Sequence, residues 1–170
     1  MVIATPLIEP LARHHGRTAF RCGSDPLDRY LQQQARQDAE KHVAAPFVLT
    51  APPETAVLGF YTLSAAVVAV GDIEPELARK LPRYPQLPVT LVGRLAVDER
   101  LKGQGWGSFL LMDALRRSLA HAAEIAAMAV VVDAKDETAA DFYRRFDFTP
   151  LQGNARRLYL PMQTVARVLG

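Results

Sequence analysis

The sequence predicts an α+β fold with an α/β layered arrangement, in which helices pack on a sheet. It also predicts a single domain over residues 1–170. The first observation is the length of 170 residues, which suffices for one hydrophobic core without disulfides or metal. The second is the composition, with 49% apolar and 22% charged residues, typical of a globular domain. The third is the order of the patterns along the chain, which is helix, two strands, and then strand–helix–strand–helix–strand.

In the first half, the run Ser24-Asp25-Pro26-Leu27 carries capping residues and an early proline, which predict the start of a helix. Apolar residues then follow at helical spacing to about residue 42. Residues 47–50 and 57–64 read as two antiparallel strands joined by a short turn, and the second strand can continue to Val70. A short helix is expected over residues 74–81.

In the second half, Pro82, Pro85 and Pro88 predict a rigid, extended connector. Further elements are expected as follows: a strand at 90–97, a helix at 104–121, a strand at 127–133, a helix capped by Asp136 or Thr138 and ending near 146, and a last strand at 157–160.

Several classes of protein are disfavoured. The apolar stretch 57–70 is shorter than the roughly 20 residues that cross a bilayer, and the N-terminus lacks the pattern of a secretion signal. A lone cysteine, Cys22, cannot form an intrachain disulfide and is expected to be a small buried hydrophobe, so the cytoplasm is the expected compartment. The net charge of +2 is small, but the basic residues are sixteen arginines and four lysines, which suits phosphate binding or simply reflects codon bias.

The strongest motif is the turn Arg100-Leu-Lys-Gly103-Gln-Gly105-Trp-Gly107, between an expected strand and an expected helix. Alternate glycines let backbone N–H groups converge, and a helix N-terminus adds a partial positive charge, so the turn suits a phosphate or pyrophosphate. A purely structural glycine turn would look similar. The spacing matches neither a Walker loop nor a dinucleotide-binding fingerprint.

The pattern Arg100-x-x-Gly103-x-Gly105 resembles the signature of the GNAT superfamily of N-acetyltransferases. The resemblance covers nearly the whole chain and is most specific to the GNAT-type toxins of bacterial toxin–antitoxin pairs. It rests on the order and spacing of these segments: Phe20-Arg-Cys-Gly23, Leu27-Asp28, Gly59-Phe-Tyr-Thr-Leu-Ser64, Pro82-x-Tyr84-Pro85, Gly93-Arg-Leu-Ala-Val-Asp98, Asp133-Ala-Lys-Asp-Glu-Thr-Ala139 and Phe142-Tyr143.

The resemblance implies a GNAT fold, with a mixed central sheet, splayed central strands and helices on both faces. It implies acetyl-coenzyme A as cosubstrate, no metal, and Tyr143 as the proton donor to the departing thiolate; from spacing alone, Tyr143 is equally well an aromatic packing residue. The implied cofactor-binding residues are Leu95, Ala96 and Val97 for the pantetheine arm, Lys102, Gly103, Gln104, Gly105, Trp106 and Gly107 for the pyrophosphate, and Asp136. Two residues depart from the family pattern: Trp106 replaces a smaller aliphatic residue, and Asp147 replaces a glycine.

Residues 90–97 contain no Glu, Asp or His, so the strand offers no general base. A lysine ε-amine, with a pKa of about 10.4, is neutral only about once in a few thousand molecules at pH 7, whereas an α-amine with a pKa of about 8 is neutral roughly a tenth of the time. An aminoacyl ester has a still more acidic α-amine. The missing base therefore favours such a substrate.

This agrees with what the toxin resemblance implies, namely acetylation of the α-amino group of aminoacyl-tRNA and inhibition of translation. Arg83 and Arg94 are candidate tRNA contacts, while Arg29 and Arg36 are more simply solvated charges. The family also implies a ribbon-helix-helix antitoxin and a homodimer. The alternatives are an acetyltransferase for a small-molecule or protein amine, and a non-catalytic binding module. His14-His15 has no apparent companion ligand in the sequence, so no metal site is expected there.

Overall fold

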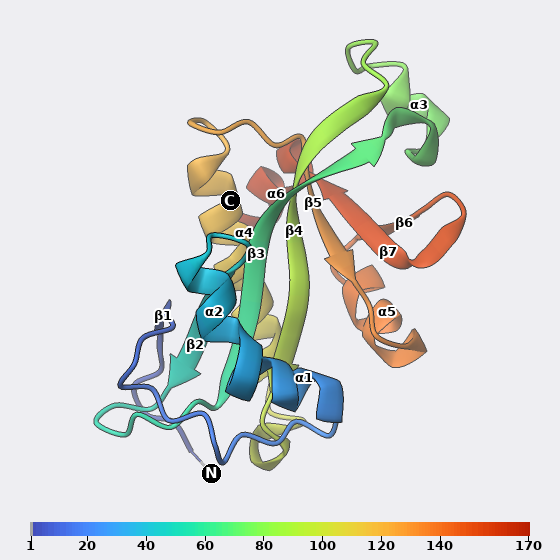
Figure 1. The fold of residues 1–170 in the computed structure, drawn as a ribbon. Coiled ribbons are helices and arrows are strands. Elements are labelled where there is room, and N and C mark those ends of the chain that lie inside the picture. The colour runs from blue at the N-terminus through green and yellow to red at the C-terminus, as the bar shows by residue number, and fades with distance from the viewer. Residues whose placement is uncertain (1) are drawn as a thin grey trace. The chain divides into compact units, whose positions relative to one another are not determined.

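Seven strands pair into one mixed sheet in the computed structural model, which describes residues 2–170 (Figure 1). The strands are β1 (Leu7–Pro10), β2 (Ala45–Thr50), β3 (Gly59–Ala69), β4 (Gln86–Val97), β5 (Ala129–Asp133), β6 (Thr149–Leu151) and β7 (Asn154–Pro161). Their order in the sheet is β1-β2-β3-β4-β5-β7-β6. The pairing of β4 with β5 is parallel, whereas β1–β2, β2–β3, β5–β7 and β6–β7 are antiparallel.

The helical elements connect these strands. They are α1 (Asp25–Arg29), the π-helical turn η1 (Tyr30–Gln34), α2 (Ala35–Glu40), the 3-10 turn η2 (Val70–Asp72), α3 (Pro75–Ala78), the 3-10 turn η3 (Glu99–Leu101), α4 (Trp106–His121), α5 (Glu137–Arg144) and α6 (Met162–Leu169). Among residues 2–170 there is no helix whose length and hydropathy would let it cross a bilayer.

The chain divides into two compact units. The first runs up to Ser64 and includes Gly93–Ala114, and the second holds Ala65–Val92 and Leu115–Gly170.

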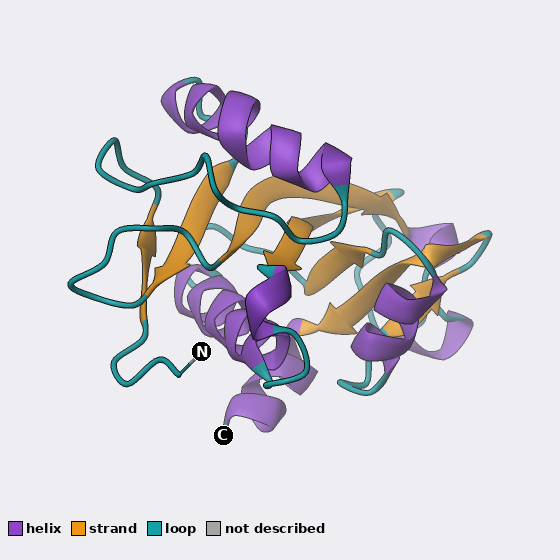
Figure 2. Ribbon diagram, turned by 90° about the horizontal axis from the view of Figure 1, so that it is seen from below, coloured by secondary structure: helices purple, strands orange, loops and turns teal. Residues whose placement is uncertain are grey.

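In the first unit, helices cover both faces of the strands (Figure 2). The α1–η1–α2 segment lies on one face, where Tyr30, Leu31 and Ala35 join a buried core with Phe60 of β3 and Ala96 of β4. Neighbouring strand residues point to opposite faces, so Gly59 faces the other side. A Cβ on Gly59 would lie 2.9 Å from Leu110 Cδ1, so α4 packs directly against the strand there. The first unit is therefore a helix–sheet–helix sandwich.

In the second unit, β5, β7 and β6 lie side by side, and α5 and α6 pack on β7. Its core contains Val68, Leu87, Val131 and Tyr159. The hydroxyl of Tyr159 accepts a hydrogen bond from the Glu74 amide at 3.2 Å, which fixes the start of α3 to β7. The first four residues of β5 are apolar and buried, as expected of a strand covered on both faces, and Asp133 ends the strand.

The predicted order of elements is confirmed, with three corrections. The helix expected to run unbroken to about residue 42 contains the π-helical turn η1, and His42 adopts a positive φ of 58° after its end. The strand expected at 90–97 starts at Gln86 and includes Pro88, whose carbonyl accepts a hydrogen bond from the Met128 amide. The short elements β1 and β6 and the terminal helix α6 were not expected.

Candidate functional site

The loop between β4 and α4 has the backbone that the sequence predicts for an anion cradle. Gly103 and Gly105 adopt φ values of +77° and +86°, a region that disfavours side chains, and open space surrounds the position of a Cβ at either glycine. The amide of Phe109 donates to the carbonyl of Gly105 at 3.1 Å, which starts the helical ladder of α4. The preceding N–H groups therefore have no acceptor within the helix and are available to an anion.

Two aromatic rings stand at the first turn of α4. Trp106 and Phe109 pack edge to face with their ring centroids 5.2 Å apart, and Phe109 is 40% exposed. The unusual Trp106 thus has a packing partner on its own helix.

Of the two basic residues near this loop, Arg100 is already engaged. Its Nε and Nη2 donate to the two carboxylate oxygens of the buried Asp98 at 2.9 and 3.2 Å. Burial alone raises the pKa of Asp98, but hydrogen bonds from the side chain and amide of Arg100 and from the amide of Arg21 outweigh it, so the net pKa is lowered. Arg100 therefore holds the turn in place. Lys102 is exposed, and its Nζ would lie 3.0 Å from a Cβ on Gly23.

The end of β4 contains the three residues that the family resemblance assigns to the pantetheine arm, Leu95, Ala96 and Val97. The parallel pairing with β5 runs from Thr90↔Val130 to Val92↔Val132, before Leu95 is reached. Ala96 is buried under α1 and α2, while Leu95 and Val97 alternate to the opposite face and are half-buried. The strand ends at Asp98, whose amide donates to the Leu58 carbonyl at 2.9 Å.

The candidate tRNA-binding arginines lie in different surroundings. Arg94 is half-buried on β4, with its guanidinium carbon 3.6 Å from the centre of the Tyr30 ring. Arg83 is exposed on the connector before β4. Arg36 pairs with Glu40 one turn later on its own helix at 3.1 Å, and Arg29 is exposed. No pattern in the sequence predicts the contact between Arg94 and Tyr30, which are far apart along the chain.

Tyr143 is buried on α5, where its ring packs edge to face on Phe142 and against Phe148. Burial raises the pKa of its phenol, and the negative charge of Asp133 raises it further. No residue within 2–170 forms a hydrogen bond with this hydroxyl, and every fully buried polar side-chain atom described has a partner. Tyr143 therefore combines a packed ring with a hydroxyl proton that no described residue accepts.

Asp136 is the N-cap of α5, as one of the two alternatives from the sequence predicts, because its Oδ1 accepts the Ala139 amide at 2.8 Å.

Comparison with known proteins identifies the family. Residues 60–150 match the family model described as an acetyltransferase (GNAT) domain. A tRNA-acetylating toxin of Mycobacterium tuberculosis (strain ATCC 25618 / H37Rv) is 34% identical over 153 residues, which cover 90% of each chain. The chain belongs to the GNAT acetyltransferase family.

Two solved structures are similar to this GNAT acetyltransferase over almost its whole length. AtaT complexed with acetyl-methionyl-tRNAfMet has a TM-score of 0.91 at 27% identity, covering 98% of this chain and 100% of AtaT. A tyrosine-to-phenylalanine mutant of AtaT, bound to the C-terminus of the antitoxin AtaR and to acetyl-CoA, has a TM-score of 0.83 at 26% identity, covering 96% and 97%.

The departure of this GNAT chain at Asp147 has a backbone explanation. Asp147 adopts a φ of +69° in the turn after α5, where its amide donates to the Arg144 carbonyl. Glycine adopts such a conformation without strain, and aspartate is one of the few other residues that tolerate it. Asp147 therefore preserves the turn at a small cost in stability.

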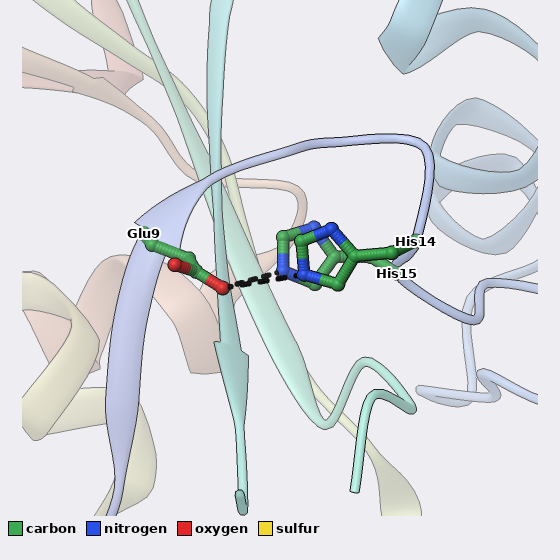
Figure 3. A group of neighbouring side chains, drawn as sticks. All are labelled: Glu9, His14 and His15. Carbon is green, nitrogen blue, oxygen red and sulfur yellow. Dashed lines mark hydrogen bonds and ion pairs between the residues drawn. The ribbon is translucent and has the colours of Figure 1, made fainter. Parts of the chain in front are cut away.

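Outside the GNAT signature, the fold brings Glu9 to the His14-His15 pair, which the sequence did not predict (Figure 3). By residue type these three side chains form a metal-ligand set. The amide of Ala12, however, donates to Nδ1 of His15 at 2.9 Å, which places the proton of the neutral ring on Nε2. Nε2 then donates to Glu9 Oε1 at 2.9 Å and has no lone pair for a metal. The cluster is a hydrogen-bonded tether between β1 and the following loop.

Proposed function

We propose that this GNAT acetyltransferase moves the acetyl group of acetyl-coenzyme A to the α-amino group of aminoacyl-tRNA and so inhibits translation. The observation that carries the proposal is the absence of any Glu, Asp or His at residues 90–97 of β4. A base-free strand suits an amine that is already substantially neutral near pH 7. The similarity to a tRNA-acetylating toxin and to AtaT supports the same substrate class.

The residues of the β4–α4 loop are proposed to bind the cosubstrate. Amides of the segment Lys102, Gly103, Gln104, Gly105, Trp106 and Gly107 would hold the pyrophosphate, as the positive φ of both glycines and the free first turn of α4 favour. Backbone groups of Leu95, Ala96 and Val97 would pair with the pantetheine amides. Oδ1 of Asp136 accepts the capping hydrogen bond of α5, and its other carboxylate oxygen would face the cosubstrate.

Tyr143 is proposed as the general acid. The α-amine nitrogen attacks the thioester carbonyl carbon, and the tetrahedral intermediate collapses with cleavage of the C–S bond. The departing thiolate takes the phenolic proton, and the proton released by the attacking nitrogen restores the phenol directly or through water. The raised pKa of Tyr143 keeps the phenol protonated at neutral pH, so the proton is available in every turnover.

An antitoxin with a ribbon-helix-helix DNA-binding part is the proposed protein partner, and a homodimer the proposed assembly. The complex of AtaT with the C-terminus of AtaR supports the first proposal. Arg83 and Arg94 are proposed to contact tRNA phosphates, because one is exposed and the other has guanidinium donors that no residue within 2–170 accepts.

The test is transfer of labelled acetyl from acetyl-coenzyme A to charged and to uncharged tRNA. We expect label only on the charged tRNA, and only at its α-amine. Lack of transfer to any charged tRNA by protein that binds acetyl-coenzyme A would contradict the proposal, and transfer to a small-molecule or protein amine instead would favour that other substrate class.

A further inference from the structure

Arg94 is held against an aromatic surface in the first unit. Its guanidinium carbon lies 3.6 Å from the centroid of the Tyr30 ring, within the range of a cation–π contact. Tyr30 is only 8% exposed, and its ring stacks on Phe60 at a centroid distance of 6.1 Å and an interplanar angle of 18°. The arginine therefore rests on a ring that cannot easily move.

The hydroxyl of Tyr30 is fixed as well. It donates to Asp38 Oδ2 at 2.9 Å, and Gln34 Nε2 donates to Asp38 Oδ1 at 2.9 Å. Burial raises the pKa of this phenol, and the hydrogen bond to Asp38 raises it further, so it stays a donor. The ring is thus held by its face through Phe60 and by its oxygen through Asp38.

The π-helical turn explains how Tyr30 and Asp38 meet. Eight residues of regular α-helix turn through about 800°, which would leave the two side chains about 80° apart. In η1 the amide of Ala35 bonds to the carbonyl of Tyr30, five residues earlier, and this wider turn removes part of the offset. The irregularity in the helix therefore brings Asp38 to the Tyr30 hydroxyl.

The guanidinium itself keeps its donors free, since no residue within 2–170 accepts a hydrogen bond from Arg94. Arginine offers a planar fork of N–H groups that matches a phosphate, and it stacks on aromatic rings as lysine does not. One face of Arg94 is occupied by Tyr30, which leaves the N–H edge to a ligand.

The position of Arg94 on β4 favours charged tRNA over acetyl-coenzyme A as the ligand of its guanidinium. Arg94 and Ala96 are two residues apart, so they share the face of β4 that α1 and α2 cover. The glycine loop leads into α4, which packs on the opposite face at Gly59. Arg94 is therefore on the side away from the helix that begins at the cosubstrate loop.

We propose that Tyr30, fixed by Asp38, is a positioning residue that orients Arg94 to bind a backbone phosphate of the acceptor end of the charged tRNA. This inference rests on the proposed function. The new claim concerns the ring of Tyr30. Removing this ring should weaken the binding of charged tRNA through Arg94 and leave KM for acetyl-coenzyme A unchanged.

The experiment measures KM for charged tRNA and for acetyl-coenzyme A in wild type, Tyr30→Leu, Tyr30→Phe, Arg94→Gln and the double variant Tyr30→Leu/Arg94→Gln. We expect Tyr30→Leu to raise KM for charged tRNA about five- to tenfold, in line with loss of a partly buried cation–π contact. Tyr30→Phe, which keeps the ring, should stay within about twofold of wild type. In the Arg94→Gln background, Tyr30→Leu should have no further effect on this KM.

The salt dependence gives a second readout. Arg94→Gln should reduce the slope of log(kcat/KM) against log salt for charged tRNA by about 0.7, the value for one phosphate contact on a single strand. Arg94→Lys keeps the charge but not the fork, so it should raise KM for charged tRNA as Tyr30→Leu does. Lysine also cannot stack on the Tyr30 ring as the planar guanidinium does, so this variant disrupts the same contact without altering the core and tests it if Tyr30→Leu does not fold.

Additive effects of Tyr30→Leu and Arg94→Gln would overturn the inference, and so would a rise in KM for acetyl-coenzyme A alone. If the wild type acetylates no charged tRNA, the proposed function itself is contradicted. If the wild type is active but the variants keep its KM for charged tRNA, only the inference about Tyr30 is contradicted.

Discussion

Asp98 and Arg100 form a two-point ion pair at the entrance to the glycine loop, with one carboxylate buried and one guanidinium half exposed. The carboxylate also accepts the amides of Arg100 and Arg21 at 3.0 and 3.3 Å. The arginine that begins the acetyltransferase signature thus acts on the backbone of its own turn.

Replacing Arg100 by Gln should lower the free energy of unfolding by about 1 kcal/mol, because the buried carboxylate loses its charged donor but keeps two backbone donors. The pKa of Asp98 is lowered in the folded state, so its stabilising contribution is present above the unfolded pKa of about 3.9 and is lost as the pH falls below it. Urea unfolding at pH 7 and pH 3 checks this. The difference between wild type and variant should shrink at pH 3, and a difference that grows on acidification would contradict the ion pair.

Tyr143→Phe should reduce acetyl transfer about a hundredfold or more, the usual range for loss of a general acid. Because the hydroxyl bonds to no described residue, the melting temperature should not fall. Single-turnover kinetics and thermal unfolding test the two expectations separately. A variant that unfolds at lower temperature would place the hydroxyl in the packing of α5 instead.

The pH profile of the wild type should reflect the substrate amine. The pKa of Tyr143 is raised above its usual value of about 10, so this phenol remains protonated throughout the working range. The rate should rise from pH 6 to pH 9 as the α-amine loses its proton, with no falling limb from Tyr143. A fall in rate between pH 8 and pH 9 on intact charged tRNA would show that another acid is at work.

Gly105→Ala tests the backbone of the loop. A Cβ there meets no atom within 4 Å, so the cost is conformational, about 1 kcal/mol for a side chain at a φ of +86°. KM for acetyl-coenzyme A should rise severalfold as the amides of the turn shift. Gly71→Ala is the matched control, since Gly71 has equally open surroundings without a positive φ. Equal effects of the two variants on KM would exclude a special role for the loop.

Zinc should not stabilise the protein, because His15 uses Nδ1 as an acceptor from Ala12 and Nε2 as a donor to Glu9. Glu9→Ala, by contrast, should cost about 1–3 kcal/mol, since it leaves a buried N–H without a partner. Thermal unfolding with and without Zn²⁺ measures the first effect, and urea unfolding measures the second. A rise in melting temperature with Zn²⁺ that Glu9→Ala abolishes would instead establish a metal site.

The sequence predicts those parts of the molecule that rest on local periodicity. The spacing of the glycines predicts the strand–turn–helix around Gly103. The apolar run predicts β5 as a strand buried on both faces. The π-helical turn at Tyr30 cannot be predicted in this way, because the spacing of apolar residues over a single turn fits both an α-helix and the wider π-helix. Short elements such as β6 lack enough residues for a pattern.

Contacts made by distant segments escape sequence reasoning for a different reason. Arg94 is visible as a basic residue on a strand, but only the fold shows that Tyr30 lies under it. Glu9 joins His15 through a turn whose shape no motif encodes. Such pairs depend on tertiary packing, and a single sequence carries no record of which residues meet.

The boundaries between the two compact units fall inside β3, β4 and α4 and in no flexible linker. Each unit is therefore assembled from two separate stretches of chain. Any single break in the chain falls inside a helix or strand, or leaves part of one unit covalently attached to the other. A fragment that holds only the residues of the first unit would lack Tyr143 and also the part of α4 that follows Ala114. Truncated genes should accordingly yield unfolded chains rather than half-enzymes, and ribosome-bound chains should remain incomplete until β7 has emerged.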